Sequence, residues 1–119
     1  MSEIQSYRDL IAWQKAFETG VAVYAVSKTI PDHERFGLIS QMRRSAVSIA
    51  SNIAEGYGRQ SRTDYVRFLR VARGSLYELE TQMLFAVELG YVEQSASETV
   101  FGKLGECGRV LAGLIRSLE

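Results

Sequence analysis

The sequence predicts an all-α protein, an antiparallel up-down-up-down four-helix bundle that forms a single domain over residues 1–119. Four segments repeat apolar residues at the three- and four-residue spacing that aligns side chains on one helical face, and nothing between them alternates like a strand. The intervening segments, near residues 30–34, 57–61 and 90–95, are short enough to make successive helices antiparallel neighbours. With 46% hydrophobic residues, the chain is also long enough to bury one core.

The first two expected helices lie on either side of Pro31, the only proline, which interrupts a helix because it lacks a backbone N–H. Asp9 is a suitable N-cap for the first helix. The aromatic residues Trp13, Phe17 and Tyr24 are expected in the core rather than on a base-stacking surface. The apolar stripes are Leu10, Trp13, Phe17, Gly20 or Val21, and Tyr24 in the first helix, and Ile39, Met42, Ala46, Ile49, Ile53 and Tyr57 in the second.

The third and fourth expected helices each begin with a capping-box pattern, in which a serine side chain accepts a hydrogen bond from a backbone N–H of the first turn. The patterns are Ser61-x-x-Asp64 and Ser95-x-x-Glu98. Gly90 closes the third helix. The apolar stripes are Tyr65, Leu69, Ala72, Leu76, Leu79, Met83 and Ala86 in the third helix, and Val100, Leu104, Cys107, Leu111, Leu114 and Leu118 in the fourth.

Three of the helices carry further small or apolar residues beside the main stripe. A monomeric bundle would leave these residues in water, and contiguous apolar surface of this kind marks an interface, so we expect a homo-oligomer. Glycines such as Gly105 and Gly108 destabilise a helix interior by up to ~1 kcal/mol each relative to alanine, which favours close approach of a neighbouring backbone over a frayed helix. The expected interface residues are Ala12, Ala16 and Val23 of the first helix, Val47 and Ala54 of the second, and Phe101, Gly105, Gly108, Ala112 and Ile115 of the fourth.

The formal net charge is zero, which argues against a generally basic nucleic-acid-binding protein, but the charges are unevenly distributed. Residues 41–73 hold seven arginines against Glu55 and Asp64, whereas residues 74–119 hold three basic groups against seven acidic ones. Arginine binds phosphate or carboxylate through a planar, two-pronged donor. The candidate nucleic-acid-binding residues, called the arginine strip below, are Arg44, Arg59, Arg62, Arg67, Arg70 and Arg73.

Two interpretations of the arginine strip remain open. It either holds phosphates without reading bases, or it pairs with the acidic last third of the chain across helix or subunit contacts. Arg43 is expected at the flank of the second helix, where it could reach a carboxylate on an adjacent helix. The face that carries Ser45, Ser48 and Asn52 is expected to point away from the core, as a solvated surface or a low-relief surface for a partner.

The inventory of reactive side chains argues against an enzyme. A di-iron bundle site needs a Glu-x-x-His motif on two helices, and the chain has one histidine, His33, so we expect no metal and no cofactor. Cys107 lies on the main stripe of the fourth helix and is expected to be a buried, inert thiol. No apolar run reaches the roughly 18 residues needed to cross a bilayer, and the N-terminus lacks signal-peptide features, so we expect a cytoplasmic protein without a membrane partner.

Three long segments carry a resemblance to a known family, and they read "YRDLIAWQKAFE", "RFGLISQMRRSAVSIASNIAEGYGRQSRTDYVRFL" and "ARGSLYELETQ". In these segments the chain resembles the four-helix-bundle family encoded in intervening sequences of bacterial 23S ribosomal RNA genes. That family is similar in turn to the accessory variability determinant protein of diversity-generating retroelements. The resemblance implies a four-helix bundle, a homopentamer and binding to nucleic acid, and it implies no catalytic residue.

Two classes of function follow from the sequence. The first is a homo-oligomer, pentameric by the resemblance, that binds RNA or DNA through the arginine strip without sequence specificity. The alternative is a structural or protein-interaction scaffold that docks another protein, such as a polymerase, without binding nucleic acid. Salt-sensitive retention on heparin discriminates between the two, because phosphate contacts weaken as salt rises.

Overall fold

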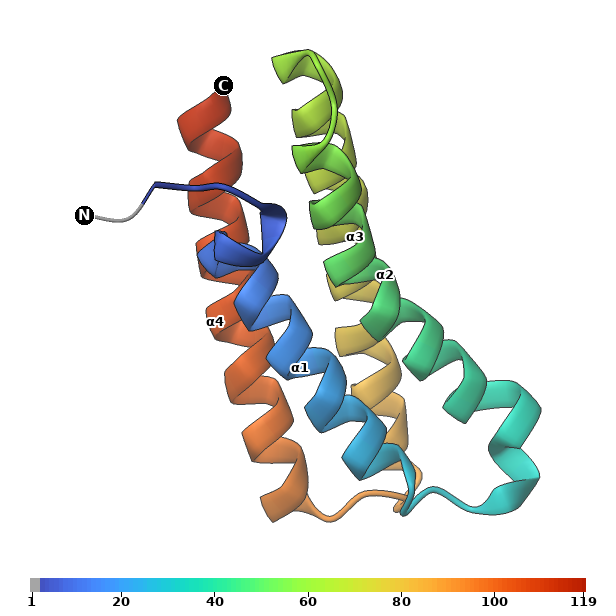
Figure 1. Ribbon diagram of the computed structural model, residues 1–119. Helices are drawn as coiled ribbons and strands as arrows, with labels where there is room; N and C mark the ends of the chain where they lie inside the picture. Colours follow the sequence, from blue (N-terminus) through green and yellow to red (C-terminus); the bar gives the residue numbers. More distant parts are fainter. Residues whose placement is uncertain (1–2) are drawn as a thin grey trace.

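The computed structural model describes residues 3–119, and these residues form four helices packed together without a strand (Figure 1). The prediction of an all-α chain of four helices is confirmed. In Figure 1 the chain runs down α1, up α2, down α3 and up α4. Each helix packs against the next in sequence, and α1 also packs against α4. The helices are α1 (Ile11–Ser27), α2 (Ser40–Tyr57), α3 (Arg62–Glu88) and α4 (Gln94–Leu118).

The core is formed by the apolar stripes expected for α2, α3 and α4. Met42, Ile49 and Ile53 of α2 are fully buried, as are Leu69 and Leu79 of α3. On α4 the buried stripe is Val100, Leu104, Cys107 and Leu111, while Leu114 and Leu118 pack against its edge. For these three helices, the periodicity of the sequence located the core face correctly.

The core face of α1 is different from the predicted one. The buried stripe consists of small residues, whereas Phe17 is 53% exposed, Tyr24 is exposed and Trp13 is only half-buried. A small-residue face lets α1 lie close to α2, and an added Cβ on Gly20 would lie 3.8 Å from the backbone oxygen of Ala46. Aromatic side chains in that position would hold the two helices apart. The buried residues of α1 are Ala12, Ala16, Thr19, Val23, Val26 and Ser27.

The serine-bearing face of α2 was predicted to point away from the core, and this prediction is wrong. The face packs against α3. Ser45 is buried, and the Ser48 hydroxyl lies 2.8 Å from the Ser75 hydroxyl of α3. Asn52 donates from Nδ2 to the backbone oxygen of Ser48 at 2.8 Å, and this bond helps to hold the amide within the interface. Short side chains therefore let α2 and α3 approach closely.

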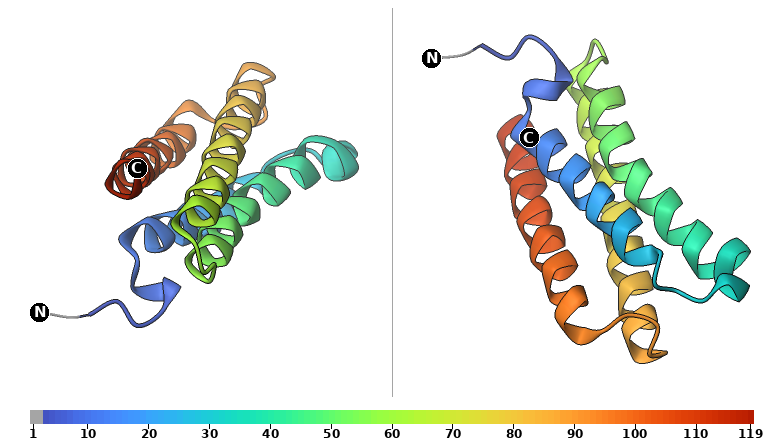
Figure 2. Two further views of the ribbon diagram at one scale, coloured as in Figure 1. Left: turned by 90° about the horizontal axis from the view of Figure 1, so that it is seen from above. Right: turned by 60° about the horizontal axis from the view of Figure 1, so that its bottom comes forward.

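The closest approach of α2 and α3 is at Gly56, near the turn that joins them. A Cβ on Gly56 would lie 2.8 Å from the Phe68 Cβ and 3.1 Å from the backbone oxygen of Tyr65. From this point the helices cross, and the beginning of α2 diverges from the end of α3 (Figures 1 and 2). The divergence leaves a groove between them, which is described below.

The helix ends match the predicted caps in part. The Ser61 hydroxyl accepts from the backbone N–H of Asp64 at 3.1 Å, as expected. After α3, Gly90 has φ of 77°, and the backbone N–H of Tyr91 donates to the backbone oxygen of Ala86 at 2.9 Å. This is the pattern of a Schellman motif. Asp9 does not cap α1, because its carboxylate accepts from residues that precede the short 3₁₀ turn Tyr7–Asp9.

The predicted capping box of α4 is wrong. The helix begins at Gln94, with Glu93 as its N-cap residue and no side-chain cap hydrogen bond. Ser95 therefore lies inside the first turn. The first backbone bond is Ser97 N–H to the Glu93 oxygen, at 3.0 Å.

We predict that Gly56→Ala destabilises the fold by roughly 1 to 3 kcal/mol, because the added methyl group overpacks the α2–α3 contact. Gly102→Ala is the matched control, since no atom lies within 4 Å of the added Cβ there. The control should stabilise the protein by up to ~1 kcal/mol through helix propensity. Urea denaturation of the two variants checks the prediction, and a Gly56 variant as stable as the control would contradict the close approach.

Candidate nucleic-acid interface

The structure divides the arginine strip into separate groups. At the α2–α3 turn, Arg59 and Arg67 both lie over the ring of Phe68, with guanidinium carbons 4.5 and 4.8 Å from its centroid. Arg59 also pairs with Glu55 at 3.0 Å, and Arg67 lies 3.6 Å from Asp64. The third arginine of this turn cluster, Arg62, is exposed and forms no ion pair within residues 3–119.

The two arginines farther along α3 have different surroundings. Arg70 donates to the carboxylate of Glu119 at the end of α4, so it links α3 to α4. Arg73 is half-buried and forms no ion pair within the described residues. Arg70 is thus the member of the strip that pairs with the acidic last third of the chain.

Arg44 lies in a groove formed by α2, the segment that precedes it and Tyr24 of α1. This arginine groove has a volume of about 640 Å³ and contains two further arginines that the strip did not include. Phe36, which is 89% exposed, and Tyr24 supply aromatic rings. The residues that line it are Tyr24, Arg35, Phe36, Ile39, Ser40, Arg43, Arg44, Val47 and Ser48.

The three arginines of the groove differ in how their charge is neutralised. Arg35 forms a two-pronged pair with Asp32, at 2.9 and 2.8 Å. Arg43 donates from Nε to the Ser27 hydroxyl at 2.9 Å and lies over the ring of Tyr24 at 4.8 Å. The prediction that Arg43 reaches a carboxylate is therefore wrong.

Arg44 is exposed and forms no ion pair among residues 3–119, and no carboxylate lines the groove. Arg43 and Arg44 thus present unopposed positive charge beside two aromatic rings. In nucleic-acid-binding proteins, guanidinium groups contact phosphates and exposed aromatic rings stack bases, so this combination is a candidate site for such contacts.

Sequence reasoning missed Arg35, Phe36 and Tyr24 as members of this site. Arg35 precedes the segment in which the arginines were counted, and Tyr24 was assigned to the core. Gly37 has φ of −106° and ψ of −108°, a break in helical geometry just before α2, and this break lies next to Phe36. The adjacent sequence Arg35-Phe36-Gly37, with a glycine after an arginine–aromatic pair, was the available signal.

An apolar groove of about 450 Å³ continues from the arginine groove along α1 and α2, and Tyr24 and Val47 belong to both. The Trp13 and Phe17 rings stack at 5.1 Å in its wall, and Val21 is 57% exposed. Of the residues that line this exposed apolar surface, only Ala16, Val47 and Ala54 were predicted at a subunit interface. Its aromatic residues Trp13, Phe17 and Tyr24 were expected in the core. The residues that line it are Tyr7, Trp13, Ala16, Phe17, Gly20, Val21, Tyr24, Ala46, Val47, Ala50, Ser51 and Ala54.

The predicted interface residues therefore fall into three sets. Val47 and Ala54 line the apolar groove, to which the buried Ala16 also contributes. Ala12, Ala16, Val23 and Ile115 are buried within the chain, so their placement on an exposed stripe is wrong. The physical reason is that the small face of α1 packs inside its own bundle.

The remaining interface candidates lie on α4, where Phe101, Gly105, Gly108 and Ala112 are half-buried. Within the chain, an added Cβ on Gly108 would make an ordinary 3.8 Å contact with Leu76. The nearest atom to an added Cβ on Gly105 is the Arg109 side chain, at 3.3 Å. No backbone of another helix approaches these two glycines closely, so the expected close approach is absent within the described chain.

Residues 8–113 match the sequence model of a protein family described as "23S rRNA-intervening sequence protein". The chain belongs to this family. A solved structure from Bacteroides thetaiotaomicron, described as a protein of unknown function from the S23 ribosomal protein family, is similar at 24% identity and a TM-score of 0.81. The similarity covers 88% of this chain and 98% of that one, and it establishes a shared fold. No curated protein matches the chain.

This member of the 23S rRNA-intervening sequence protein family has no group of three potential metal ligands within its described residues. His33 is exposed, and its Nε2 lies 3.3 Å from the hydroxyl of Tyr91. Tyr91 donates to Glu34, and desolvation together with this bond raises the pKa of Tyr91. None of the helices in residues 3–119 combines the length and hydropathy needed to cross a membrane.

Cys107 is buried, as predicted. Burial, and to a smaller extent the nearby charge of Glu106, raises the pKa of its thiol from 9.0 to about 11. The contribution of the neutral thiol to the free energy of unfolding is therefore complete below pH 9. This contribution is lost as the pH rises through 11.

We predict that an aromatic disulfide reagent modifies Cys107 in the native protein at least about 100-fold more slowly than in urea at pH 8, because raising the pKa by two units removes that much thiolate. Stopped-flow absorbance measures the two rates. Equal rates would mean that Cys107 is accessible in the folded protein.

Proposed function

We propose that this protein is a homo-oligomeric antiparallel up-down-up-down four-helix bundle that binds nucleic acid through phosphates, without sequence specificity. The observation that carries the proposal is the arginine groove, where Arg43 and Arg44 have no carboxylate partner beside the rings of Tyr24 and Phe36. Five subunits are proposed from the family resemblance alone.

The geometry of the groove supports single-stranded nucleic acid as its ligand. Phe36 is the most exposed large apolar side chain of the described residues and protrudes beside Arg35. Each base stacked on an aromatic ring contributes about 1 to 3 kcal/mol, and every base offers such a face. Ser40 and Ser48 are the polar neutral residues of the groove wall, which favours contacts with the backbone over an extensive base-reading surface.

The turn cluster of Arg59, Arg62 and Arg67 is proposed as a second phosphate contact. Arg59 and Arg67 face nearby carboxylates, but their ion pairs are exposed, and exposed pairs contribute only about 0 to 1 kcal/mol. A phosphate can therefore compete for both guanidinium groups. Arg70 is expected to contribute least, because it belongs neither to the turn cluster nor to the arginine groove.

The oligomer is proposed to form through the apolar groove. Its exposed aromatic and aliphatic side chains would otherwise remain in water, at a cost of about 25 cal/mol for each Å² of apolar surface. The apolar groove also leads directly into the arginine groove. Subunits joined there would bring several arginine groups onto one assembly, and several weak phosphate contacts then act together.

The same apolar groove supports the alternative, a scaffold that docks another protein such as a polymerase. Under that alternative the arginines bind carboxylates of the partner and nucleic acid is not bound. The salt experiment below distinguishes the two functions, because it uses purified protein and nucleic acid alone.

We predict that the purified protein binds unrelated single-stranded RNA and DNA sequences with similar affinity at low salt. Arg44→Gln should weaken binding to all of them and reduce the slope of log affinity against log salt by about 0.7 for each engaged subunit. Phe36→Ala should weaken binding while leaving that slope unchanged, because it removes stacking and no charge. Fluorescence anisotropy over a salt series measures both effects.

Arg70→Gln is the matched control for these variants, since Arg70 is an exposed arginine outside the arginine groove. It should leave the affinity and the slope close to those of the unmodified protein. The nucleic-acid proposal fails if the unmodified protein does not bind at low salt, or if Arg44→Gln leaves the slope unchanged.

For assembly, we predict a light-scattering mass that is a multiple of the 13.3 kDa of one chain, with five copies expected. Val21→Asp should shift the mass toward 13.3 kDa, because Val21 is an exposed wall residue of the apolar groove. Val71→Asp should leave the mass unchanged, because Val71 is an exposed valine of α3 that lines neither the apolar groove nor the arginine groove. A monomeric unmodified protein would refute the assembly.

A further inference from the structure

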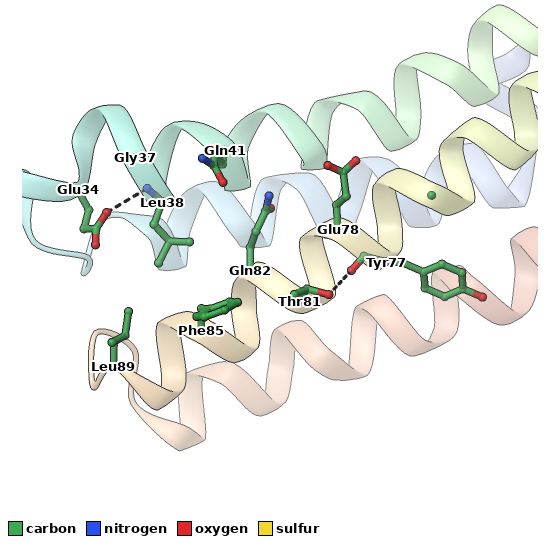
Figure 3. A pocket seen from close by; sticks show the side chains of 11 residues that line it. Glu34, Gly37, Leu38, Gln41, Tyr77, Glu78, Thr81, Gln82, Phe85 and Leu89 are labelled. Carbon is green, nitrogen blue, oxygen red and sulfur yellow. Dashed lines mark hydrogen bonds between the residues drawn. The ribbon is translucent and has the colours of Figure 1, made fainter.

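A third groove lies on the other side of α2, where α2 diverges from the C-terminal half of α3 (Figure 3). Its volume is about 670 Å³. We call it the acidic groove, because Glu34 and Glu78 line it and no lysine or arginine does.

Two rows of α3 residues, each with a spacing of four, form one wall of the acidic groove. Glu78 and Gln82 extend toward α2, where Gln41 lies (Figure 3). The other row contains Tyr77, Phe85 and Leu89, which are 58%, 59% and 54% exposed. Large apolar side chains therefore lie directly beside a polar row.

Three polar side chains of the groove lack partners. Gln41, Glu78 and Gln82 form no side-chain hydrogen bond or ion pair within residues 3–119, and the Gln82 Oε1 atom is buried without a donor. Glu34 is different, because it accepts from the backbone N–H of Leu38 and from the Tyr91 hydroxyl. A buried acceptor without a hydrogen bond destabilises a protein, so the groove gains from an occupant that supplies donors.

We propose that the acidic groove binds a basic amphipathic helix of another protein. Apolar side chains of that helix would pack on Tyr77, Phe85 and Leu89, and its arginine or lysine side chains would pair with Glu78 and donate to the amide of Gln82. The occupant is helical because the groove lies between two helices and exposes no strand edge, so an extended peptide would find no backbone ladder to join.

Charge separates this site from the arginine groove. Nucleic acid is repelled by Glu34 and Glu78, whereas a cationic helix is attracted to them. The two grooves flank opposite sides of the beginning of α2, and each selects a ligand of the opposite sign. The proposal is therefore independent of the proposed nucleic-acid binding and stands if that function fails.

The test uses the full-length protein and a fluorescein-labelled helical peptide that carries leucine at every third or fourth position, with arginines beside them. The peptide should bind, and a matched peptide with glutamate in place of arginine should not. Phe85→Ser should weaken binding about tenfold or more, as expected for loss of a central apolar anchor. Glu78→Gln should weaken it about threefold and reduce the salt dependence.

The matched controls are Leu84→Ser and Glu88→Gln, which change an exposed leucine and an exposed glutamate of α3 outside the groove. Both should bind the arginine peptide like the unmodified protein. The proposal is overturned if the arginine peptide does not bind, if the glutamate peptide binds equally well, or if the controls lose as much affinity as the groove variants. It is also overturned if Phe85→Ser lowers the light-scattering mass, because the groove would then be covered by a second copy of the chain.

Discussion

The close contact between α2 and α3 at Gly56 is the constraint on which the other surfaces of this protein depend. The Phe68 Cβ and the Tyr65 backbone leave no room for a side chain there, and the short hydroxyls of Ser48 and Ser75 continue the contact along the helices. Because the two helices touch near their shared turn and cross, they must separate at the other end. The acidic groove is the space that this crossing leaves.

The packing of α1 follows the same use of small residues. Its alanine-rich face lies against α2 and α4, and this arrangement directs Trp13, Phe17 and Tyr24 outward. The outward aromatic face creates the apolar groove, and Tyr24 extends into the arginine groove under Arg43. Close packing on one side of α1 thus leaves an exposed apolar surface on its other side.

The balanced net charge of the chain conceals a spatial separation of charge. Unopposed arginines lie on the α1 side of α2, and unpaired carboxylate and amide groups lie on its α3 side. Ion pairs such as Arg70 with Glu119 neutralise part of the arginine strip, but Arg44, Arg62 and Arg73 form no ion pair in residues 3–119. This separation of charge is the basis of the two proposals, nucleic acid on the α1 side of α2 and a cationic helix on its α3 side.

The sequence by itself determined the four helices, the core stripes of α2, α3 and α4, the Ser61 cap and the helix end at Gly90, because periodicity and local hydrogen bonding are encoded within a few residues. It also placed Arg44 in the candidate arginine strip. Only the tertiary structure decided which face of α1 is buried, since Trp13 and Ala16 lie on stripes with the same helical period. It likewise assembled Tyr24, Phe36 and Arg44 into one groove, because residues distant in the sequence become neighbours only when α1 packs on α2.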